Sequence, residues 1–98
     1  MEKFNIEFLP GAVKDIEKIQ TIFREQILKE IKYELSFSPF PRLNKIKKLH
    51  GFKISTYELK VQTHGLNYRI VYRIEGYKIV AIMVVLRRDL ERHLKHLT

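Results

Sequence analysis

The strongest constraint on the fold comes from residues 68–74, which read YRIVYRI. Tyrosine and isoleucine at the even positions alternate with arginine, valine and arginine at the odd positions. A period of two places successive side chains on opposite faces of a β-strand. One face of this strand is aromatic and aliphatic and needs a core, whereas the other carries two arginines. The pattern therefore predicts a strand with one core face and one cationic face.

Two further segments predict an antiparallel meander around this strand. Residues 56–62 (TYELKVQ) alternate apolar and polar side chains, and residues 78–86 (KIVAIMVVL) are apolar on both faces, as in a central strand. Short turns at 63–67 (THGLN) and 75–77 (EGY) separate the three segments. Strands joined by such short turns are expected to pair antiparallel.

The first half of the chain predicts one strand followed by two helices. Residues 3–8 (KFNIEF) alternate like a short strand, and a helix starting near Pro10 runs to about residue 19. A longer helix spans about residues 22–37, with an apolar stripe at i, i+4 spacing. So short a break between two helices predicts a helix hairpin. The following segment, residues 38–53, contains two prolines and is predicted to be a basic loop.

These elements define a single α+β domain, residues 1–98, with the order β-α-α-β-β-β. The helix hairpin is expected to cover one face of the antiparallel sheet and to leave the other partly open. Leucines at positions 90, 94 and 97 give the tail, residues 87–98, the apolar edge of a short C-terminal helix.

Composition narrows the cellular setting. The chain has no cysteine, which excludes disulfides, thiolate catalysis and Cys-type zinc sites and suits a reducing cytoplasm. The longest apolar run, residues 79–86, is much shorter than the roughly 20 residues of a membrane-spanning helix. The first eight residues contain no apolar signal-peptide core. We therefore expect a cytoplasmic protein.

Charge is distributed unevenly along the chain. The net charge is +8, yet residues 1–39 sum to −1 and residues 40–98 sum to +9. This asymmetry indicates a polyanionic partner, with nucleic acid first and an acidic protein second. The alternative is that the basic charge only keeps the protein soluble.

In this order, the motifs resemble the RelE/ParE toxin superfamily of bacterial and archaeal toxin–antitoxin systems, and the RelE-like branch in particular. The segments that carry the resemblance are KKLHG (47–51), YELKV (57–61), YRIVYRIEG (68–76) and VVLRRD (84–89). The leading strand and the helices containing AVKDIEKI and FREQILKEI match in order, so the resemblance covers nearly the whole chain. It implies a compact toxin that is neutralised by a cognate antitoxin protein.

The two branches of the superfamily imply two different activities on one fold. The RelE branch implies a metal-independent endoribonuclease, or mRNA interferase, that cuts mRNA in the decoding site of the ribosome, beside 16S rRNA. The ParE branch implies an inhibitor of DNA gyrase that is not an enzyme. A third reading is a catalytically silent member that only binds its antitoxin. No cofactor is expected in any of these cases.

Arg69 is the first candidate for the catalytic site. RNA cleavage without a metal needs a base, positive charge around the transition state and an acid for the leaving group. Arginine suits the second role because its planar fork binds phosphate oxygens and stays charged. By the resemblance, Arg69 matches the arginine that contacts the scissile phosphate. The alternative is a structural arginine paired with Glu58 on the neighbouring strand.

Lys60 and Glu58 lie on the polar face of the preceding strand. By the resemblance, Lys60 matches a lysine that stabilises charge or acts as a base, and Glu58 stands where relatives have another lysine. Glu58 could replace that lysine as the base, or simply neutralise Arg69. For Lys60, a solvated surface role remains the alternative.

The end of the last strand supplies the remaining catalytic candidates. Arg87 and Arg88 stand where RelE relatives place a basic residue, and Leu86 stands where many have a histidine. Losing that imidazole removes the natural acid or base near neutral pH. His93 falls near a tyrosine or histidine used by some RNA-cleaving branches, with an ordinary tail histidine as the alternative. The histidines show no tight ligand spacing with carboxylates, so no metal site is predicted.

Further cations are predicted to bind RNA phosphates without reading sequence. Four of them form a basic cluster in the loop, namely Arg42, Lys45, Lys47 and Lys48. The other two are Arg73 of the strand and Arg88 of the tail. The basic cluster is predicted to bind ribosomal RNA or an acidic face of the antitoxin. The alternative is that it is only a solvated loop. Lys60, Arg69 and Arg87 are expected to converge on the open face of the sheet.

Overall fold

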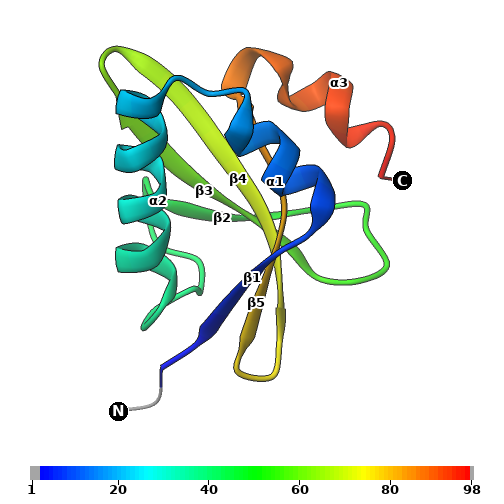
Figure 1. Cartoon of the computed structure of the whole chain (residues 1–98). Coiled ribbons are helices and arrows are strands. Elements are labelled where there is room, and N and C mark those ends of the chain that lie inside the picture. The colour runs from blue at the N-terminus through cyan, green and yellow to red at the C-terminus, as the bar shows by residue number, and fades with distance from the viewer. Residues whose placement is uncertain (1–2, 98) are drawn as a thin grey trace.

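A computed structural model describes residues 3–97 and shows one mixed sheet with helices on both faces (Figure 1). The strands are β1 (Asn5–Phe8), β2 (Ile46–Leu49), β3 (Thr56–Thr63), β4 (Leu66–Glu75) and β5 (Lys78–Leu86). The helices are α1 (Pro10–Glu17), α2 (Thr21–Leu35) and α3 (Leu90–Leu94), and a 3₁₀ turn, η1 (Arg87–Asp89), precedes α3. The strand order is β1-β5-β4-β3-β2, with β1 parallel to β5 and the other pairs antiparallel.

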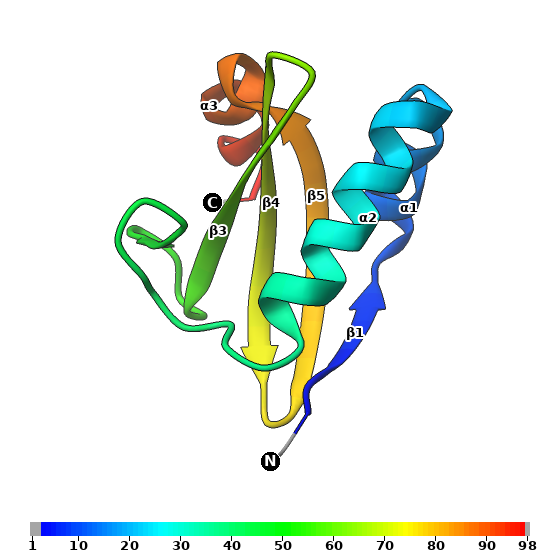
Figure 2. The same cartoon turned by 90° about the vertical axis from the view of Figure 1, so that its left-hand side faces the viewer.

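The helix hairpin covers one face of the sheet, as the sequence predicted (Figure 2). Ile27, Ile31 and Leu35 form the buried stripe of α2 and pack into the core formed by β3, β4 and β5. Burying each such side chain contributes roughly 1.5–3 kcal/mol of transfer free energy. Two sets of hydrogen bonds hold α1 in place, one to the sheet and one to α2. The Val84 backbone N–H donates to Asp15 Oδ2 at 2.9 Å, and Arg24 of α2 donates to three carbonyls at the end of α1 and the turn after it.

The opposite face of the sheet is only partly open, because α3 packs on it (Figure 2). Leu90 and Leu94 contact an apolar cluster formed by Val71, Met83 and Val85. The predicted tail helix is therefore present, and its apolar edge covers the middle of this face. On either side of α3 the face remains accessible.

The predicted order lacked one strand. Residues 46–49 lie in the segment that was expected to be a loop, but they form β2 at the edge of the sheet, antiparallel to β3. A tight turn at Arg42–Ile46, with Asn44 at a φ of 63°, starts this strand. Three of the four side chains of β2 are not fully buried, and two are lysines. An apolar alternation was therefore not visible in the sequence.

No helix among residues 3–97 is long and apolar enough to span a membrane. Tyr68 and Tyr72 are buried in the core, and Tyr57 packs against it. The aromatic face of residues 68–74 is therefore buried, as the sequence predicted.

Candidate functional site

Cross-strand pairing brings the predicted catalytic residues to one face of the sheet. Lys60 of β3 is directly opposite Arg69 of β4, and Lys47 of β2 is directly opposite Glu58 of β3. Directly opposed residues have Cβ atoms about 4.5–5.5 Å apart, so their side chains can interact. Three neighbouring strands thus present a compact group of charged side chains on the same face as α3.

These side chains line a pocket of about 250 Å³ between the sheet and the C-terminal helix. It contains four cations, two carboxylates and three leucines, namely Lys47, Lys60, Arg69, Arg87, Glu58, Glu91, Leu49, Leu90 and Leu94. We call it the cationic pocket. It is small and mostly polar, and its size and charge suit one phosphate group with its attached sugar. The expected convergence of Lys60, Arg69 and Arg87 is present.

Arg69 lies at the floor of the cationic pocket, with 8% of its surface exposed. Its Nε lies 3.8 Å from Glu58 Oε1, and its Nη1 donates to the Tyr68 carbonyl oxygen at 3.1 Å. Burial lowers the pKa of the Arg69 guanidinium, the Glu58 carboxylate opposes this effect, and the charge of Arg87 adds to it. The ion pair between Arg69 and Glu58, which the sequence left as an alternative, is thus formed. The Arg69 guanidinium nevertheless lines the cationic pocket.

Glu58 is the least accessible charged group of the cationic pocket, with 5% of its surface exposed. One carboxylate oxygen faces Arg69, whereas Oε2 has no hydrogen-bond partner among residues 3–97. A buried carboxylate oxygen without a partner is unusual, because such a group loses its hydration without compensation. Oε2 is therefore an unsatisfied acceptor beneath the surface of the cationic pocket.

The rim of the cationic pocket carries the other cations. Lys60 is half-buried, and Lys47 and Arg87 are exposed. Within the described residues, none of the three has a carboxylate at ion-pair distance. They can therefore bind an incoming anion without first breaking an internal ion pair.

Six predicted site residues lie outside the cationic pocket, and three of them belong to β4 and the tail. His93 is half-buried on α3, and its Nδ1 donates to the Asp89 carbonyl oxygen at 2.9 Å. Arg88 is exposed on η1. Arg73 points to the same face as Arg69 but four residues along β4, where its Nη2 lies 3.5 Å from Glu75 Oε2. None of these three side chains lines the cationic pocket, and their predicted roles stay predictions.

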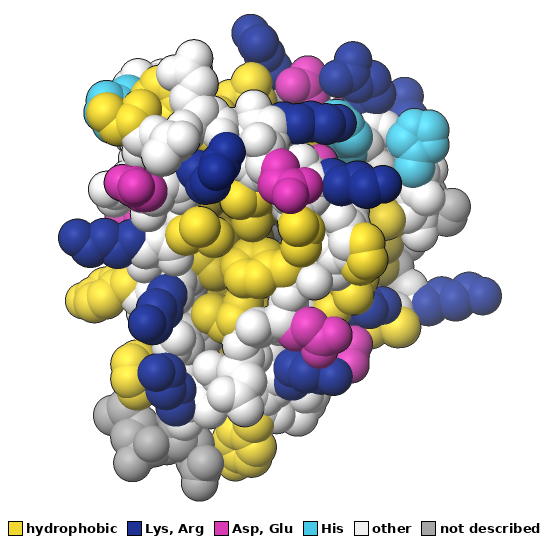
Figure 3. Space-filling model, viewed as in Figure 1, with side chains coloured by type: hydrophobic (Ala, Val, Ile, Leu, Met, Phe, Trp, Pro, Cys, Tyr) yellow, Lys and Arg dark blue, Asp and Glu magenta, His cyan; other side chains and the backbone are white. Residues whose placement is uncertain are grey.

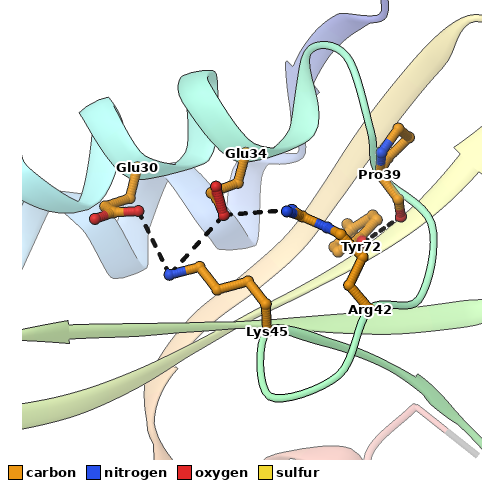
Figure 4. A network of polar contacts seen from close by, with 6 residues as sticks. All are labelled: Glu30, Glu34, Pro39, Arg42, Lys45 and Tyr72. Atoms are coloured by element: carbon orange, nitrogen blue, oxygen red, sulfur yellow. Dashed lines mark hydrogen bonds and ion pairs between the residues drawn. The ribbon is translucent and has the colours of Figure 1, made fainter.

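The basic cluster divides into two parts, of which only Arg42 and Lys45 pair with acidic side chains of α2 (Figure 4). Arg42 Nη2 lies 3.3 Å from Glu34 Oε2, and Lys45 Nζ lies 3.6 Å from Glu30 Oε2 and 3.9 Å from Glu34 Oε2. These two cations therefore attach the loop to α2. Lys47 and Lys48, on β2, have no such partner among the described residues.

Tyr72 also holds this loop, through a hydrogen bond to Pro39 (Figure 4). Its hydroxyl donates to the Pro39 carbonyl oxygen at 2.6 Å, and its ring stacks on Tyr57 with centroids 5.7 Å apart. Burial raises the pKa of the Tyr72 hydroxyl well above its ordinary value. The loop that leads into β2, and so to Lys47, is thus held at both ends.

Sequence reasoning placed Lys47 among the phosphate-binding residues but missed other residues that line the cationic pocket. Leu49 and Glu91 had no assigned role, and Leu90 and Leu94 were predicted only as the apolar edge of the tail helix. The i, i+4 spacing of Leu90 and Leu94 was the available signal, but it did not say which face of the sheet the tail would cover. Among residues 3–97, no group of three or more His, Asp or Glu side chains could hold a metal ion.

The structure thus combines a helix hairpin on one face of a sheet with a cationic pocket on the other. Residues 6–91 match the family model described as the ParE toxin of the type II toxin–antitoxin system parDE, and the chain belongs to this family. A comparison with curated proteins found no match.

Solved structures of RelE toxins confirm the predicted fold class. The RelBE2 toxin–antitoxin complex from Mycobacterium tuberculosis matches with a TM-score of 0.72 at 24% identity, covering 91% of this chain and 97% of that one. The intact Escherichia coli RelBE complex matches with a TM-score of 0.66 at 28% identity, covering 84% and 94%. A double arginine-to-alanine mutant of E. coli RelE in the free state matches with a TM-score of 0.69 at 25% identity over 100% of both chains.

Proposed function

We propose that this toxin is a metal-independent endoribonuclease that cuts ribosome-bound mRNA in the cytoplasm and thereby stops translation. The observation that supports this proposal is the cationic pocket, in which four cations surround a buried carboxylate with an unpartnered oxygen. A gyrase inhibitor needs neither a general base nor a pocket that fits a phosphate, whereas a ribonuclease needs both.

Each chemical role in the cleavage has a candidate side chain. Glu58 Oε2 takes the proton of the 2′-hydroxyl, and the 2′-oxygen attacks phosphorus. Lys60, Arg69 and Arg87 stabilise the negative charge of the phosphorane-like transition state. The bond to the 5′-oxygen then breaks, leaving a 2′,3′-cyclic phosphate and a 5′-hydroxyl.

Lys47 is the best-placed acid for the leaving 5′-oxygen. An ammonium group carries a proton at neutral pH, and the alkoxide that leaves is far more basic than an amine. Because Lys47 is directly opposite Glu58, it can recover the proton that Glu58 has accepted. The two side chains then return to their starting protonation states.

The residue at position 86 does not decide which group is the base, because its side chain lies on the other face of the sheet. Leu86 packs against the core on the helix-hairpin side of the sheet and does not line the cationic pocket. Glu58 is the buried carboxylate of this pocket, whereas Glu91 is exposed.

A cognate antitoxin is the proposed protein partner. The structures of RelE toxins described above include complexes with RelB antitoxins. In this protein, apolar side chains gather in a hollow between α2 and β1, with Lys and Arg side chains beside it (Figure 3). This groove, of about 320 Å³, includes Phe4, Ile6, Phe8, Leu28 and Ile31. It suits an amphipathic segment of an antitoxin.

Inhibition of DNA gyrase is the second candidate function, because the matching family model is described as a ParE toxin. Two assays separate the candidates. Purified protein is incubated with ribosomes and mRNA, and separately with gyrase and relaxed plasmid. Cut mRNA with unimpaired supercoiling supports the nuclease, whereas intact mRNA with blocked supercoiling selects the gyrase inhibitor.

Substituting the base tests the mechanism. Glu58→Gln keeps the shape of the side chain but removes its basicity, and we expect a loss of cutting of about 10²–10⁴-fold. Glu25→Gln is the matched control, because Glu25 is exposed on α2 outside the cationic pocket. Undiminished cutting by a folded Glu58→Gln variant would remove Glu58 as the base.

A further inference from the structure

A second pocket lies on the same face of the sheet as the cationic pocket but toward the opposite end of β4. It has a volume of about 570 Å³ and crosses the sheet from the end of β1 to the loop after β2. Its lining residues are Leu9, Gly51, Phe52, Lys53, Ile54, Thr56, Arg73, Ile82 and Leu97, and none of them lines the cationic pocket. We call it the lower pocket.

The two pockets are separate sites. Arg69 and Arg73 are four residues apart on β4, which corresponds to roughly 13 Å along the strand. Val71 lies between them and is covered by Leu90 and Leu94 of α3. A phosphate bound at Arg69 therefore cannot also contact Arg73.

The lower pocket combines an apolar wall with two cations. Five of its side chains are aliphatic or aromatic, and its charged members are Arg73 and Lys53. Arg73 is half-buried, and its Nε is buried without a hydrogen-bond partner among the described residues. Its Nη2 faces Glu75, which is exposed and can turn to solvent. Lys53 is exposed and has no carboxylate at ion-pair distance among residues 3–97.

This composition suits a protein segment better than an RNA strand. A sugar–phosphate backbone carries one charge per nucleotide and offers nothing to match aliphatic side chains. The cationic pocket has four cations, whereas the lower pocket has two beside five apolar side chains. An apolar side chain next to a carboxylate would fill the wall and satisfy the buried N–H of Arg73.

We propose that the lower pocket is a docking site for a segment of the cognate antitoxin in which apolar residues neighbour Asp or Glu. An apolar side chain of this segment lies against Phe52, Ile54 and Ile82, and the adjacent carboxylate accepts a hydrogen bond from Arg73 Nε. Lys53 stabilises the same carboxylate from the rim. The proposal rests on the assignment of the chain to the toxin–antitoxin family and not on nuclease activity.

Calorimetric titration with the purified cognate antitoxin tests this site. The variants are Arg73→Gln, Lys53→Gln, their double mutant and Ile54→Gln, which changes the apolar wall at a residue that is 54% exposed. We expect the double mutant to bind the antitoxin about 10- to 100-fold more weakly, as for loss of a charge-assisted hydrogen bond. Ile54→Gln should weaken binding as well.

The matched control is Lys14→Gln/Lys18→Gln, which removes two exposed cations of the α1 region outside both pockets. Thermal melting checks that every variant is folded, and fluorescence anisotropy with a short single-stranded RNA follows nucleic-acid binding. Antitoxin affinity within twofold of wild type in folded variants would overturn the proposal. Loss of RNA affinity with unchanged antitoxin affinity would overturn it too, and would assign the lower pocket to RNA. Failure of wild-type protein to cut mRNA would count against the nuclease alone.

Discussion

The Nε atom of Arg69 lies 3.8 Å from Oε1 of Glu58, and both side chains are buried at the floor of the cationic pocket. The pair fixes the orientation of the guanidinium, which is also held by the Tyr68 carbonyl. It leaves the second oxygen of Glu58 without a partner among residues 3–97. One interaction thus serves both the stability of the sheet and the chemistry proposed for the pocket.

Arg69→Ala should destabilise the protein as well as reduce activity. Removing one partner of a buried ion pair leaves the other charge uncompensated, and we expect a loss of about 3–5 kcal/mol in the free energy of unfolding. Urea denaturation measures this value. Adding Glu58→Gln to the Arg69→Ala variant should recover a large part of the loss, because the buried charge is then gone. Additive effects of the two substitutions would show that the pair is not coupled.

Stability should decline above about pH 10 because of Tyr72. Burial raises the pKa of its hydroxyl in the folded protein, whereas an unfolded tyrosine ionises near pH 10. The unfolded state then binds fewer protons, so the free energy of unfolding falls as pH rises. One such group contributes a slope of up to about 1.4 kcal/mol per pH unit. Urea titrations at pH 8 to 11 measure it, and Tyr72→Phe should reduce the slope.

Tyr72→Phe should also cost stability at neutral pH. The substitution removes the hydrogen bond to the Pro39 carbonyl oxygen, and an unpartnered buried polar group costs about 1–3 kcal/mol. Hydrogen exchange should then increase in residues 39–45, which this bond helps to hold. Exchange equal to that of wild type would mean that the ion pairs to α2 suffice to order the loop.

Lys47 and Lys45 should differ in their effect on RNA binding. Lys47 lines the cationic pocket, whereas Lys45 is paired with Glu30 and Glu34. Each phosphate contact to a single strand contributes about 0.7 to the slope of log K against log salt. We expect Lys47→Gln to reduce this slope by about that amount and Lys45→Gln to leave it nearly unchanged. Anisotropy titrations from low to moderate salt provide the measurement, and equal slopes for the two variants would contradict the division of the cluster.

Asp15→Ala should loosen α1 from the sheet. The carboxylate accepts a hydrogen bond from the backbone N–H of Val84 in β5, and leaving that N–H without a partner costs about 1–3 kcal/mol. Thermal or urea unfolding would report the loss. Glu17→Ala is the control, because Glu17 is an exposed residue of the same helix and should change stability by less than about 0.5 kcal/mol.

Much of the fold followed from periodicity. The alternation in residues 68–74 located β4 and assigned its aromatic face to the core, and the i, i+4 stripe located α2. Boundaries differed by at most two residues at the ends of α1, α2 and β4. Strand β2 was missed, because an edge strand with two adjacent lysines carries little apolar signal and depends on pairing with β3.

The sequence predicted several residues of the candidate site, but it did not predict how their side chains are arranged. Strand alternation put Lys60 and Arg69 on the polar face, and the resemblance pointed to Arg87. Neither could say that Arg42 and Lys45 bind acidic residues of α2, or that Arg73 belongs to a different pocket. Such pairings join residues far apart along the chain, so they depend on how the elements pack.

By itself, the sequence determined the three helices and every strand except β2, which faces of these elements are apolar, and that the second half of the chain carries the positive charge. These properties depend on residues that are close together along the chain, so the local pattern of apolar, polar and charged residues is enough to predict them. Only the tertiary structure decided that Lys47 faces Glu58, that α3 separates Arg69 from Arg73, and that half of the basic cluster is neutralised by α2. Strand register and helix packing set those distances, because a shift of one residue would turn each side chain to the other face of the sheet.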